Sequence, residues 1–432
     1  MKATGLSVPD SQRFLETYGY KWADSKTSHY TKMAKCLNEP CDRILFYYTT
    51  VNTFQKFAEG GCIWASHIKY MNDWQEFELG KALVLDVLDQ YSGSKRSPRG
   101  EMAAKFIKSA ALVGREAERS GNLLKPFGYW LDYVDYWFPE VYSISFTAAE
   151  DLLSQWKMYA RECGVAIGFD FRRKVSFWQG TIEEPSGKQT YGFAQNSCFP
   201  QKVAYNKQML SKELRKTVTG IQRNYDSRTY HMISLLERIP FIKHDGFSQE
   251  DEYRMVFRPY KSWKDDHTIL RSDVGYREAD HTLIPYLRIF CGNEVDAKDP
   301  KYQIGWPVTS LTVGPGHNQD VVFRSLIHFV ESGKCKLLRL SKEEKANALS
   351  LFLKSFSNWL AIYSVEEESK NLIKQVDALT PFGKMPLDRD RVMNQLRENE
   401  KLYSLYRAYC EDNYLSRGGI HIKKSKIPYI FS

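Results

Sequence analysis

Apolar runs with strand-like character predict a mixed α/β body in the first three quarters of the chain. Ile44–Thr50 combines apolar and aromatic residues of high β-propensity and is predicted to be a buried strand. Gly164–Phe171 is a strongly apolar run of the same kind. The strands that such patterns predict are Ile44–Thr50, Cys62–Ser66, Val141–Phe146, Gly164–Phe171, Gln201–Tyr205, Phe241–His244, Glu252–Arg258, Ile284–Phe290 and Ser310–Val313.

Apolar residues at helical spacing lie between these strands and dominate the chain after Ser341. Thr50 is expected to cap a short helix over Val51–Ala58, which Gly60 and Gly61 would end. A turn followed by a helix is predicted at Tyr70–Trp74. The other predicted helices are Ser11–Tyr18, Asp86–Tyr136, Asp151–Arg161, Ser211–Ile239, Asp320–Glu331, Lys342–Tyr363 and Arg389–Asp412, with polar loops at Pro185–Pro200 and Thr380–Pro386.

These elements divide the chain into three parts and favour an α+β fold. We expect an N-terminal arm over residues 1–40, a body over 41–340 and a C-terminal helical region over 341–432. Two helical insertions, at about 86–136 and 211–239, interrupt the body. The C-terminal helices carry apolar stripes among dense mixed charge, which is typical of amphipathic helices packed on one side.

Composition points to a soluble protein with a sizeable core. The chain has 432 residues, of which 43% are hydrophobic, so one large or two ordinary domains are expected. No apolar run approaches the roughly 18 to 20 residues that span a bilayer, and the first residues lack the apolar core of a signal peptide. The cysteines form no CxxC motif and no zinc-finger spacing. We therefore expect reduced thiols, no metal and a cytoplasmic location.

The charge balance favours a polyanionic partner. The formal net charge is +9, and the pI is about 8.9. The chain also contains 27 Tyr, 24 Phe and 10 Trp. Aromatic rings beside Lys and Arg suit single-stranded nucleic acid, although most rings are expected to belong to the core.

A pair of carboxylates is the strongest candidate for chemistry. Glu250 and Glu252 are two residues apart, so they would point to the same face if the run formed a strand. Two carboxylates on one site are costly and usually have a chemical reason. Arg254 has the same register and could pair with them or hold a phosphate.

A set of short motifs carries a resemblance to a known domain. They occur in a fixed order between Ile44 and Glu331, and the set resembles a widespread bacterial domain of unknown function. That domain is in turn similar to the ADP-ribosyltransferase fold, above all to DarT-type toxins that modify nucleic acid. The motifs are Phe46-Tyr47-Tyr48-Thr49-Thr50, Trp64-Ala65-Ser66, Asn72-Asp73-Trp74-Gln75-Glu76, Ser143-Ile144-Ser145-Phe146, Gln155-Trp156-Lys157-Met158-Tyr159-Ala160, Gly164-Val165-Ala166-Ile167-Gly168-Phe169 and Glu250-Asp251-Glu252-Tyr253-Arg254.

The resemblance implies a split β-sheet core and NAD as co-substrate. The catalytic glutamate of the family matches Glu252 best, and Glu250 would activate the acceptor or support Glu252. Tyr48 stands where those toxins have a histidine and could stack on nicotinamide. The remaining candidates for holding NAD are Thr50, Ser66, Asn72, Ser145, Trp156, Tyr159 and Arg254.

Each of these residues also has a purely structural interpretation. The run from Glu250 to Arg254 could be a solvated edge strand with ordinary ion pairs. Asn72 could simply cap the following helix. In the same way, Tyr48, Trp156 and Tyr159 could be core aromatics, and Ser145 an ordinary sheet residue.

The resemblance makes an ADP-ribosyltransferase the leading hypothesis for function. It would be a toxin or phage-defence effector that modifies nucleic acid, with RNA favoured over DNA, and it implies an antitoxin that restrains it. The helices after Ser341 are a plausible docking surface for that antitoxin. Three alternatives stay open: a protein acceptor, a non-catalytic nucleotide-sensing module, and a metal-dependent nuclease that uses Glu250, Asp251 and Glu252.

Overall fold

A computed structural model describes somewhat more than half of the chain, and the chain divides into two units. The first unit comprises Met1–Glu39, His67–Val141 and Asn196–Ser248, and the second comprises Pro40–Ser66, Tyr142–Gln195 and Gln249–Ser432. The predicted arm, the insertions at 86–136 and 211–238, and the linker Thr380–Pro386 lie outside the described residues. Those residues are 41–71, 79–80, 82, 141–173, 175–183, 189–193, 199–205, 239–257, 259, 261–263, 269–271, 274–279, 281–293, 305–337, 340–363, 367–379 and 388–428.

The described part of the first unit contains short turns and the two-residue strand β7 (Gln201–Lys202), which lies in the strand predicted at Gln201–Tyr205. A 3₁₀ turn, η1 (Ile68–Tyr70), begins with the Ile68 amide donating to the Val141 carbonyl at 2.8 Å. The strand predicted at Phe241–His244 is wrong: a 3₁₀ turn, η4 (Ile239–Phe241), precedes a single bridge between Ala204 and Ile242. Pro240 lies inside that turn and has no amide to donate to a strand ladder.

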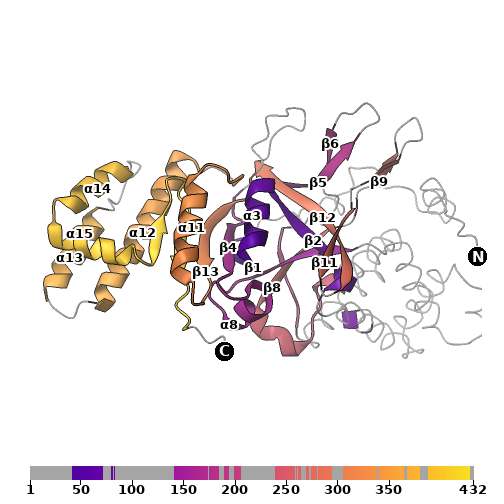
Figure 1. The fold of residues 1–432 in the computed structure, drawn as a ribbon, viewed down its shortest axis with the longest axis horizontal. Helices are drawn as coiled ribbons and strands as arrows, with labels where there is room; N and C mark the ends of the chain where they lie inside the picture. The colour runs from indigo at the N-terminus through magenta and orange to yellow at the C-terminus, as the bar shows by residue number, and fades with distance from the viewer. Residues whose placement is uncertain are drawn as a thin grey trace, which may run out of the picture. The chain divides into compact units, whose positions relative to one another are not determined.

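A mixed sheet organises the second unit, and the fold is α+β (Figure 1). Its strand order is β14-β15-β13-β4-β1-β3-β2-β12-β5-β6, with β8 paired to β3 and β11 paired to β12. Most of the predicted strands are confirmed with small shifts at their ends. The strands are β1 (Ile44–Thr49), β2 (Cys62–His67), β3 (Tyr142–Thr147), β4 (Val165–Asp170), β5 (Val175–Glu183), β6 (Gln189–Phe193), β8 (Glu252–Phe257), β11 (Val274–Ala279), β12 (Thr282–Asn293), β13 (Val308–Val313), β14 (Asn413–Leu415) and β15 (His421–Lys424).

The first helix of this unit follows the sequence rules closely. Thr50 caps α3 (Val51–Gly60), and its hydroxyl accepts a hydrogen bond from the Thr53 amide at 3.3 Å. The helix ends at Gly61, which has φ 71° and donates its amide to the Phe57 carbonyl. A positive φ at this position favours glycine. The predicted cap and the predicted glycine stop are therefore both confirmed.

Aromatic rings form the core between α3 and the sheet. Phe57 on α3 contacts Phe169 on β4 and Trp306, with ring centroids 6.0 and 6.2 Å apart. Phe146 on β3 meets the ring of Phe169 edge-on at 5.7 Å. Such tilted contacts between buried rings stabilise the fold by more than the burial of their surface area alone. Phe177 on β5 extends the same cluster, with its ring 5.6 Å from that of Trp306.

The segment from Asp151 to Arg161 forms a shorter and less regular helix than the sequence predicted. A short α8 (Leu153–Gln155) runs into a π-helical turn, η2 (Trp156–Ala160). Two further predictions need correction. β6 occupies residues that were expected to form a polar loop, and β5 and a small β9–β10 hairpin (Lys261–Trp263 and Ile269–Arg271) were not predicted.

Helices dominate the part of the second unit after Ser341, as predicted. They are α12 (Lys342–Tyr363), α13 (Glu367–Ala378), α14 (Arg389–Arg397) and α15 (Glu400–Tyr409), and they follow α11 (Gln319–Glu331). These four helices are drawn in orange and yellow in Figure 1, and they enclose a core of leucine, valine and aromatic side chains. The predicted helix over Arg389–Asp412 is two helices, because Asn399 leaves the helical conformation and caps α15 through the Leu402 amide.

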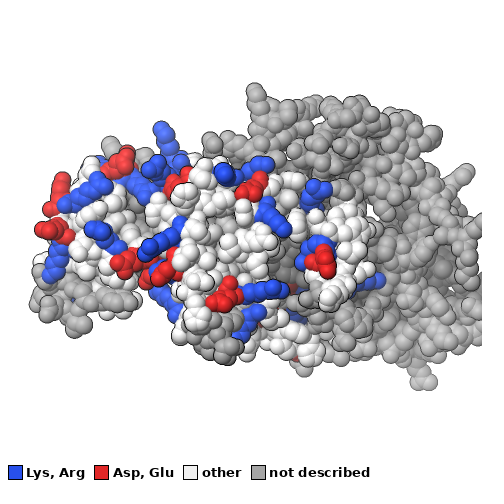
Figure 2. Space-filling model, viewed as in Figure 1, with Lys and Arg blue, Asp and Glu red and all other residues white. Residues whose placement is uncertain are grey.

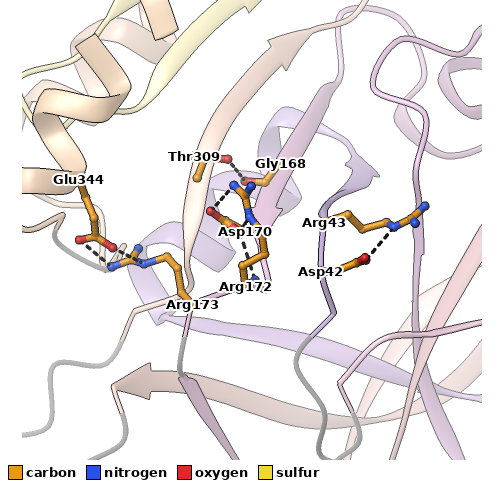
Figure 3. Close-up of polar contacts among 8 residues, drawn as sticks. All are labelled: Asp42, Arg43, Gly168, Asp170, Arg172, Arg173, Thr309 and Glu344. Atoms are coloured by element: carbon orange, nitrogen blue, oxygen red, sulfur yellow. Dashed lines mark hydrogen bonds and ion pairs between the residues drawn. The ribbon is translucent and has the colours of Figure 1, made fainter. Parts of the chain in front are cut away.

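Two sets of contacts join these helices to the sheet. Arg173, just after β4, forms an ion pair with Glu344 in the first turn of α12, with its Nε 2.9 Å from Oε1 (Figure 3). Nearby, Arg172 contacts both carboxylate oxygens of Asp170 at 2.7 and 2.8 Å. After α15 the chain returns to the sheet, where β15 pairs in parallel with β13. Asn413–Leu415 and His421–Lys424 are therefore strands of the main sheet.

Two general expectations from composition can be compared with the described residues. Among the described helices, none combines the length and the hydropathy that crossing a bilayer requires. The described cysteines are free thiols, in agreement with the prediction: Cys41, Cys62, Cys163, Cys291, Cys335 and Cys410.

Candidate functional site

The candidate site lies on a polar face of the β3–β8 ladder. The two strands are antiparallel, and the register places Thr147 opposite Glu252 and Ser145 opposite Arg254. Residues that are directly opposite share a face of the sheet, and side chains alternate along each strand. The other face carries apolar side chains, including the buried Phe146, so the ladder has one polar face and one core face.

Glu252 and Arg254 form a buried bidentate ion pair. Arg254 Nε is 2.6 Å from Glu252 Oε1, and Arg254 Nη2 is 3.0 Å from Oε2. The exposed fraction is 4% for Glu252 and 1% for Arg254. The paired geometry compensates the cost of removing both charges from water and fixes the orientation of the carboxylate. The predicted shared register of these two residues is confirmed.

Glu250 does not lie on the strand face that the sequence predicted. It is the last residue of the 3₁₀ turn η5 (Asp245–Glu250), and β8 begins only at Glu252. Asp251, between them, has φ 41°, which is in the left-handed region that side chains rarely adopt. The two-residue alternation of a strand therefore does not apply to the pair. Glu250 is nevertheless buried, so both carboxylates are withdrawn from solvent at the start of β8.

Ser145 brings an unused hydroxyl to the same face. It lies opposite Arg254, and its Oγ is buried without a hydrogen-bond partner among the described residues. Buried hydroxyls usually find a partner, so one left open is a place where a ligand or water can bind. Thr147 differs, because its hydroxyl already accepts from the Ala149 amide at 3.1 Å.

Tyr48 is packed into the protein and has its hydroxyl engaged. Its exposed fraction is 6%, and its ring meets the ring of Trp156 edge-on at 4.6 Å. The hydroxyl donates to the Ala149 carbonyl and accepts from the Leu152 amide, both at 3.0 Å. Burial raises the pKa of Tyr48. This arrangement favours the structural interpretation of Tyr48 over stacking on nicotinamide.

Trp156 and Tyr159 separate into a core residue and a partly exposed one. Trp156 is fully buried, and its indole Nε1 donates to Asp151 Oδ1 at 2.7 Å. Tyr159, on the same π-helical turn, is 37% exposed. The core interpretation is therefore confirmed for Trp156, and Tyr159 retains the exposure that a ligand contact needs.

The remaining candidates have other hydrogen bonds or lie outside the description. Thr50 caps α3, and its hydroxyl also donates to Thr53 Oγ1 at 3.1 Å. Ser66 on β2 accepts a hydrogen bond from Arg277 Nη2 at 3.2 Å. Asn72 lies outside the described residues.

Asp151 is the residue beside the site that the sequence analysis missed. Besides Trp156, its carboxylate accepts from the Ser425 hydroxyl at 2.7 Å and the Lys426 amide at 2.9 Å. Its neighbour Glu150 forms an ion pair with Lys423, with the oxygen and nitrogen 2.6 Å apart. The sequence offers only an acidic pair before a predicted helix, which is an ordinary helix-start pattern.

In the part of the chain that the structure describes, no group of three or more His, Cys, Asp or Glu side chains has an arrangement that could hold a metal ion. Glu252, which a nuclease would need as a ligand, has both oxygens bound to Arg254.

Comparisons with known proteins find a similarity to one family, over less than half of the chain. No curated protein and no solved structure matches the chain. The match to this one family spans 101 of the 432 residues and includes the π-helical turn and the β8 residues Glu252 and Arg254. Residues 155–255 match the sequence profile of an uncharacterised family, described as protein of unknown function (DUF2971).

Proposed function

We propose that this protein is an NAD-dependent ADP-ribosyltransferase that modifies nucleic acid, with RNA as the favoured acceptor. The observation that supports the proposal most is the oriented carboxylate of Glu252, beside the open hydroxyl of Ser145 on the same sheet face. An oriented carboxylate and a hydroxyl suit a sugar, whose hydroxyls both donate and accept hydrogen bonds. These residues therefore fit the ribose next to nicotinamide.

Glu252 has a defined role in this proposal. Breakage of the bond between nicotinamide and ribose produces positive charge on the sugar, as in glycoside hydrolysis. A fixed carboxylate stabilises that charge, and such fixed electrostatic groups commonly contribute about 3 to 4 kcal/mol. Arg254 holds the carboxylate in one orientation, so little rearrangement is needed during the reaction. Nicotinamide leaves with the bonding electron pair, and the acceptor atom forms the new bond to the sugar.

Glu250 is the candidate for removing the acceptor's proton. It is buried at the end of η5, two residues before Glu252, and a carboxylate in such a place can act as a general base. Proton removal of this kind contributes roughly 10²- to 10⁴-fold to the rate.

Charge and the expected biology define the proposed partners. The net charge of +9 favours a polyanionic acceptor such as RNA. An enzyme of this type would damage its own cell, so we propose a toxin or phage-defence role in the cytoplasm and an antitoxin partner. The surface of α12–α15 carries interspersed positive and negative side chains on the face drawn in Figure 2. A mixed surface of this kind can pair specifically with a protein of complementary pattern.

The test is transfer of label from NAD that is labelled on its adenylate part. The purified protein is incubated with total RNA, single-stranded DNA and cell lysate in separate reactions, and nicotinamide release is measured in each. We expect label on RNA and released nicotinamide, both lost in Glu252→Gln. Glu278→Gln removes the same charge from an exposed position on β11 and serves as the matched control. Thermal melting of both variants shows whether a loss of activity reflects unfolding.

Each result has a separate meaning. Label on lysate protein alone would keep the transferase and replace RNA with a protein acceptor. If the unaltered protein released no nicotinamide in any reaction, the transferase proposal would be wrong. Full activity in Glu252→Gln together with loss in Glu250→Gln would exchange the roles of the two carboxylates.

A nucleotide-binding module without catalysis is the second candidate. One observation favours it: both oxygens of Glu252 are bound to Arg254, so the carboxylate is already satisfied inside the protein. Equilibrium dialysis with labelled NAD separates the two functions. Saturable binding without nicotinamide release at any protein concentration would support the binding module.

A further inference from the structure

One face of three neighbouring strands carries aromatic and arginine side chains together. β12 pairs with β2, and the register places Arg288 opposite Trp64 and Tyr286 opposite Ser66. Because directly opposite residues share a face, these four side chains lie on one side of the sheet. We call this set, with Arg277, the aromatic–arginine face.

Arg277 belongs to this face through β11. The β11–β12 register places Gly275 opposite Tyr286, and Arg277 follows Gly275 by two residues on the same strand face. The hydrogen bond from Arg277 Nη2 to Ser66 Oγ, at 3.2 Å, agrees with this placement. The guanidinium group therefore reaches across β12 toward β2.

The two aromatic rings of this face stack on each other. Trp64 and Tyr286 are stacked, with centroids 4.4 Å apart and an interplanar angle of 19°. A Cβ atom at Gly275 would lie 2.5 Å from Tyr286 Cζ and 2.7 Å from its hydroxyl oxygen. The absence of a side chain at Gly275 lets the tyrosine ring lie directly against the backbone of β11. The rings are thus fixed in position before any ligand arrives.

This face is the solvent side of the strands. Arg288 is exposed, and Trp64, Tyr286 and Arg277 are partly exposed. Where β2 and β12 pair, the residues that point to the other side are buried in the core, among them Ala65 and Leu287. Partly exposed aromatic rings next to arginines differ from the buried rings around Phe169. The described contacts of those buried rings are with other aromatic rings.

We infer that the aromatic–arginine face binds single-stranded RNA. Unpaired bases stack on aromatic rings, and arginines bind the phosphates between them. The positive charge of Arg277 and Arg288 complements the backbone, as does the net charge of +9. A duplex keeps its bases stacked on one another, so the face favours single strands. RNA binding at this face does not depend on the proposed function. Only the identification of this RNA as the acceptor of ADP-ribose rests on it.

The test is binding of a fluorescent twelve-nucleotide oligouridine to the full chain without NAD, followed by anisotropy at several salt concentrations. The double variant Arg277→Gln/Arg288→Gln should weaken binding about tenfold or more and flatten the salt dependence by about 1.4 in log–log slope. Trp64→Leu should weaken binding about 5- to 150-fold, which corresponds to the loss of one stacked base.

Matched controls lie on nearby surfaces. Arg324→Gln removes an exposed arginine from α11. Tyr276→Ala removes an aromatic ring from β11 that is 65% exposed and points to the other side of the strand from Arg277. Both controls should bind RNA like the unaltered chain. Arg288 is exposed and Arg277 is partly exposed, so the arginine variants remain informative even if Trp64→Leu is unstable.

Three outcomes would overturn the inference. The first is that the unaltered chain does not bind oligouridine. The second is that the double variant and Arg324→Gln bind oligouridine with the same affinity and the same salt slope. The third is that NAD displaces the RNA with a stoichiometry of one NAD per RNA site, which would make the face a nucleotide subsite. RNA binding that persists without any ADP-ribosyl transfer would contradict the proposed function alone. Transfer to RNA with unaltered binding in the double variant would contradict only this assignment of the surface.

Discussion

Thr147 lies directly opposite Glu252, where β3 ends and β8 begins. The next amide, that of Ala148, donates to the Asp251 carbonyl at 3.3 Å. The candidate carboxylate is therefore at the end of a ladder, beside the loop that leads to Asp151. The position of that loop, and not the strand pairing alone, determines the surroundings of Glu252.

The ion pair between Glu252 and Arg254 should stabilise the fold as well as the site. Glu252→Ala removes the carboxylate that accepts two hydrogen bonds from a buried guanidinium, and breaking such a pair costs about 3 to 5 kcal/mol. Glu252→Gln should cost less, because its amide oxygen still accepts a hydrogen bond. Urea denaturation measures both. The double variant Glu252→Leu/Arg254→Met should recover most of the loss; if it is less stable than Glu252→Ala, the pair is not the source of the effect.

Asp151 should hold the segment around Ser425 against the sheet. Asp151→Ala loses hydrogen bonds from Trp156, Ser425 and Lys426, and we expect unfolding to become easier by about 3 to 5 kcal/mol. Ser425→Ala removes one of the three bonds and should cost about 1 kcal/mol. Limited proteolysis should cut Asp151→Ala faster near residue 425. Equal cleavage of the two variants would contradict the anchoring role.

Thr50 separates a structural role from a ligand role. Thr50→Ala removes the cap of α3 and should lower the free energy of unfolding by about 0.5 to 2 kcal/mol. Thr50→Ser retains the hydroxyl and should retain stability. If Thr50→Ala binds NAD as tightly as Thr50→Ser, measured by dialysis at a temperature where both are folded, Thr50 serves as a cap and makes no NAD contact.

Two adjacent glycines should respond to alanine in opposite directions. Gly61 has φ 71°, so Gly61→Ala should destabilise the protein by about 1 kcal/mol. Gly60 is the last residue of α3, and the nearest atom to an added Cβ would be Cys62 Sγ at 3.8 Å. Gly60→Ala should therefore stabilise the helix by about 0.5 to 1 kcal/mol. Thermal melting of the two variants measures both effects. Melting temperatures that shift in the same direction would refute this interpretation.

His421 should make the fold sensitive to mild acid. Burial, with a smaller effect from Lys423, lowers the pKa of His421 from 6.5 to about 3. Below pH 6.5 the His421 imidazole binds a proton in the unfolded chain but stays neutral in the folded chain. The free energy of unfolding therefore falls as the pH decreases from 6.5 toward 3. The slope reaches about 1.4 kcal/mol per pH unit. His421→Leu should lose this part of the slope in urea titrations between pH 7.5 and 5; an unchanged slope would show that other groups cause it.

The sequence predicted those elements whose signals are local. The capping hydroxyl of Thr50, the glycine stop at Gly61 and the apolar run of β4 each depend on neighbouring residues, and all three are found where expected. The same holds for Glu252 and Arg254, because alternation within one strand fixes their common face.

What depends on distant partners was not visible in the sequence. Glu250 leaves the strand because Asp251 adopts a positive φ, and no residue pattern signals this. Tyr48 is buried because its hydroxyl finds the backbone of Ala149 and Leu152, about a hundred residues away in the chain. Asn399 breaks a long helical pattern although its neighbours favour helix.

The parallel pairing of β15 with β13 has a consequence for synthesis of the chain. During translation, the edge of β13 stays without this neighbour until residues 421–424 have left the ribosome, more than a hundred residues after β13 itself was made. An open strand edge is a site for mistaken pairing with other chains. Premature stops after α15 should therefore yield protein that aggregates through the open edge of β13.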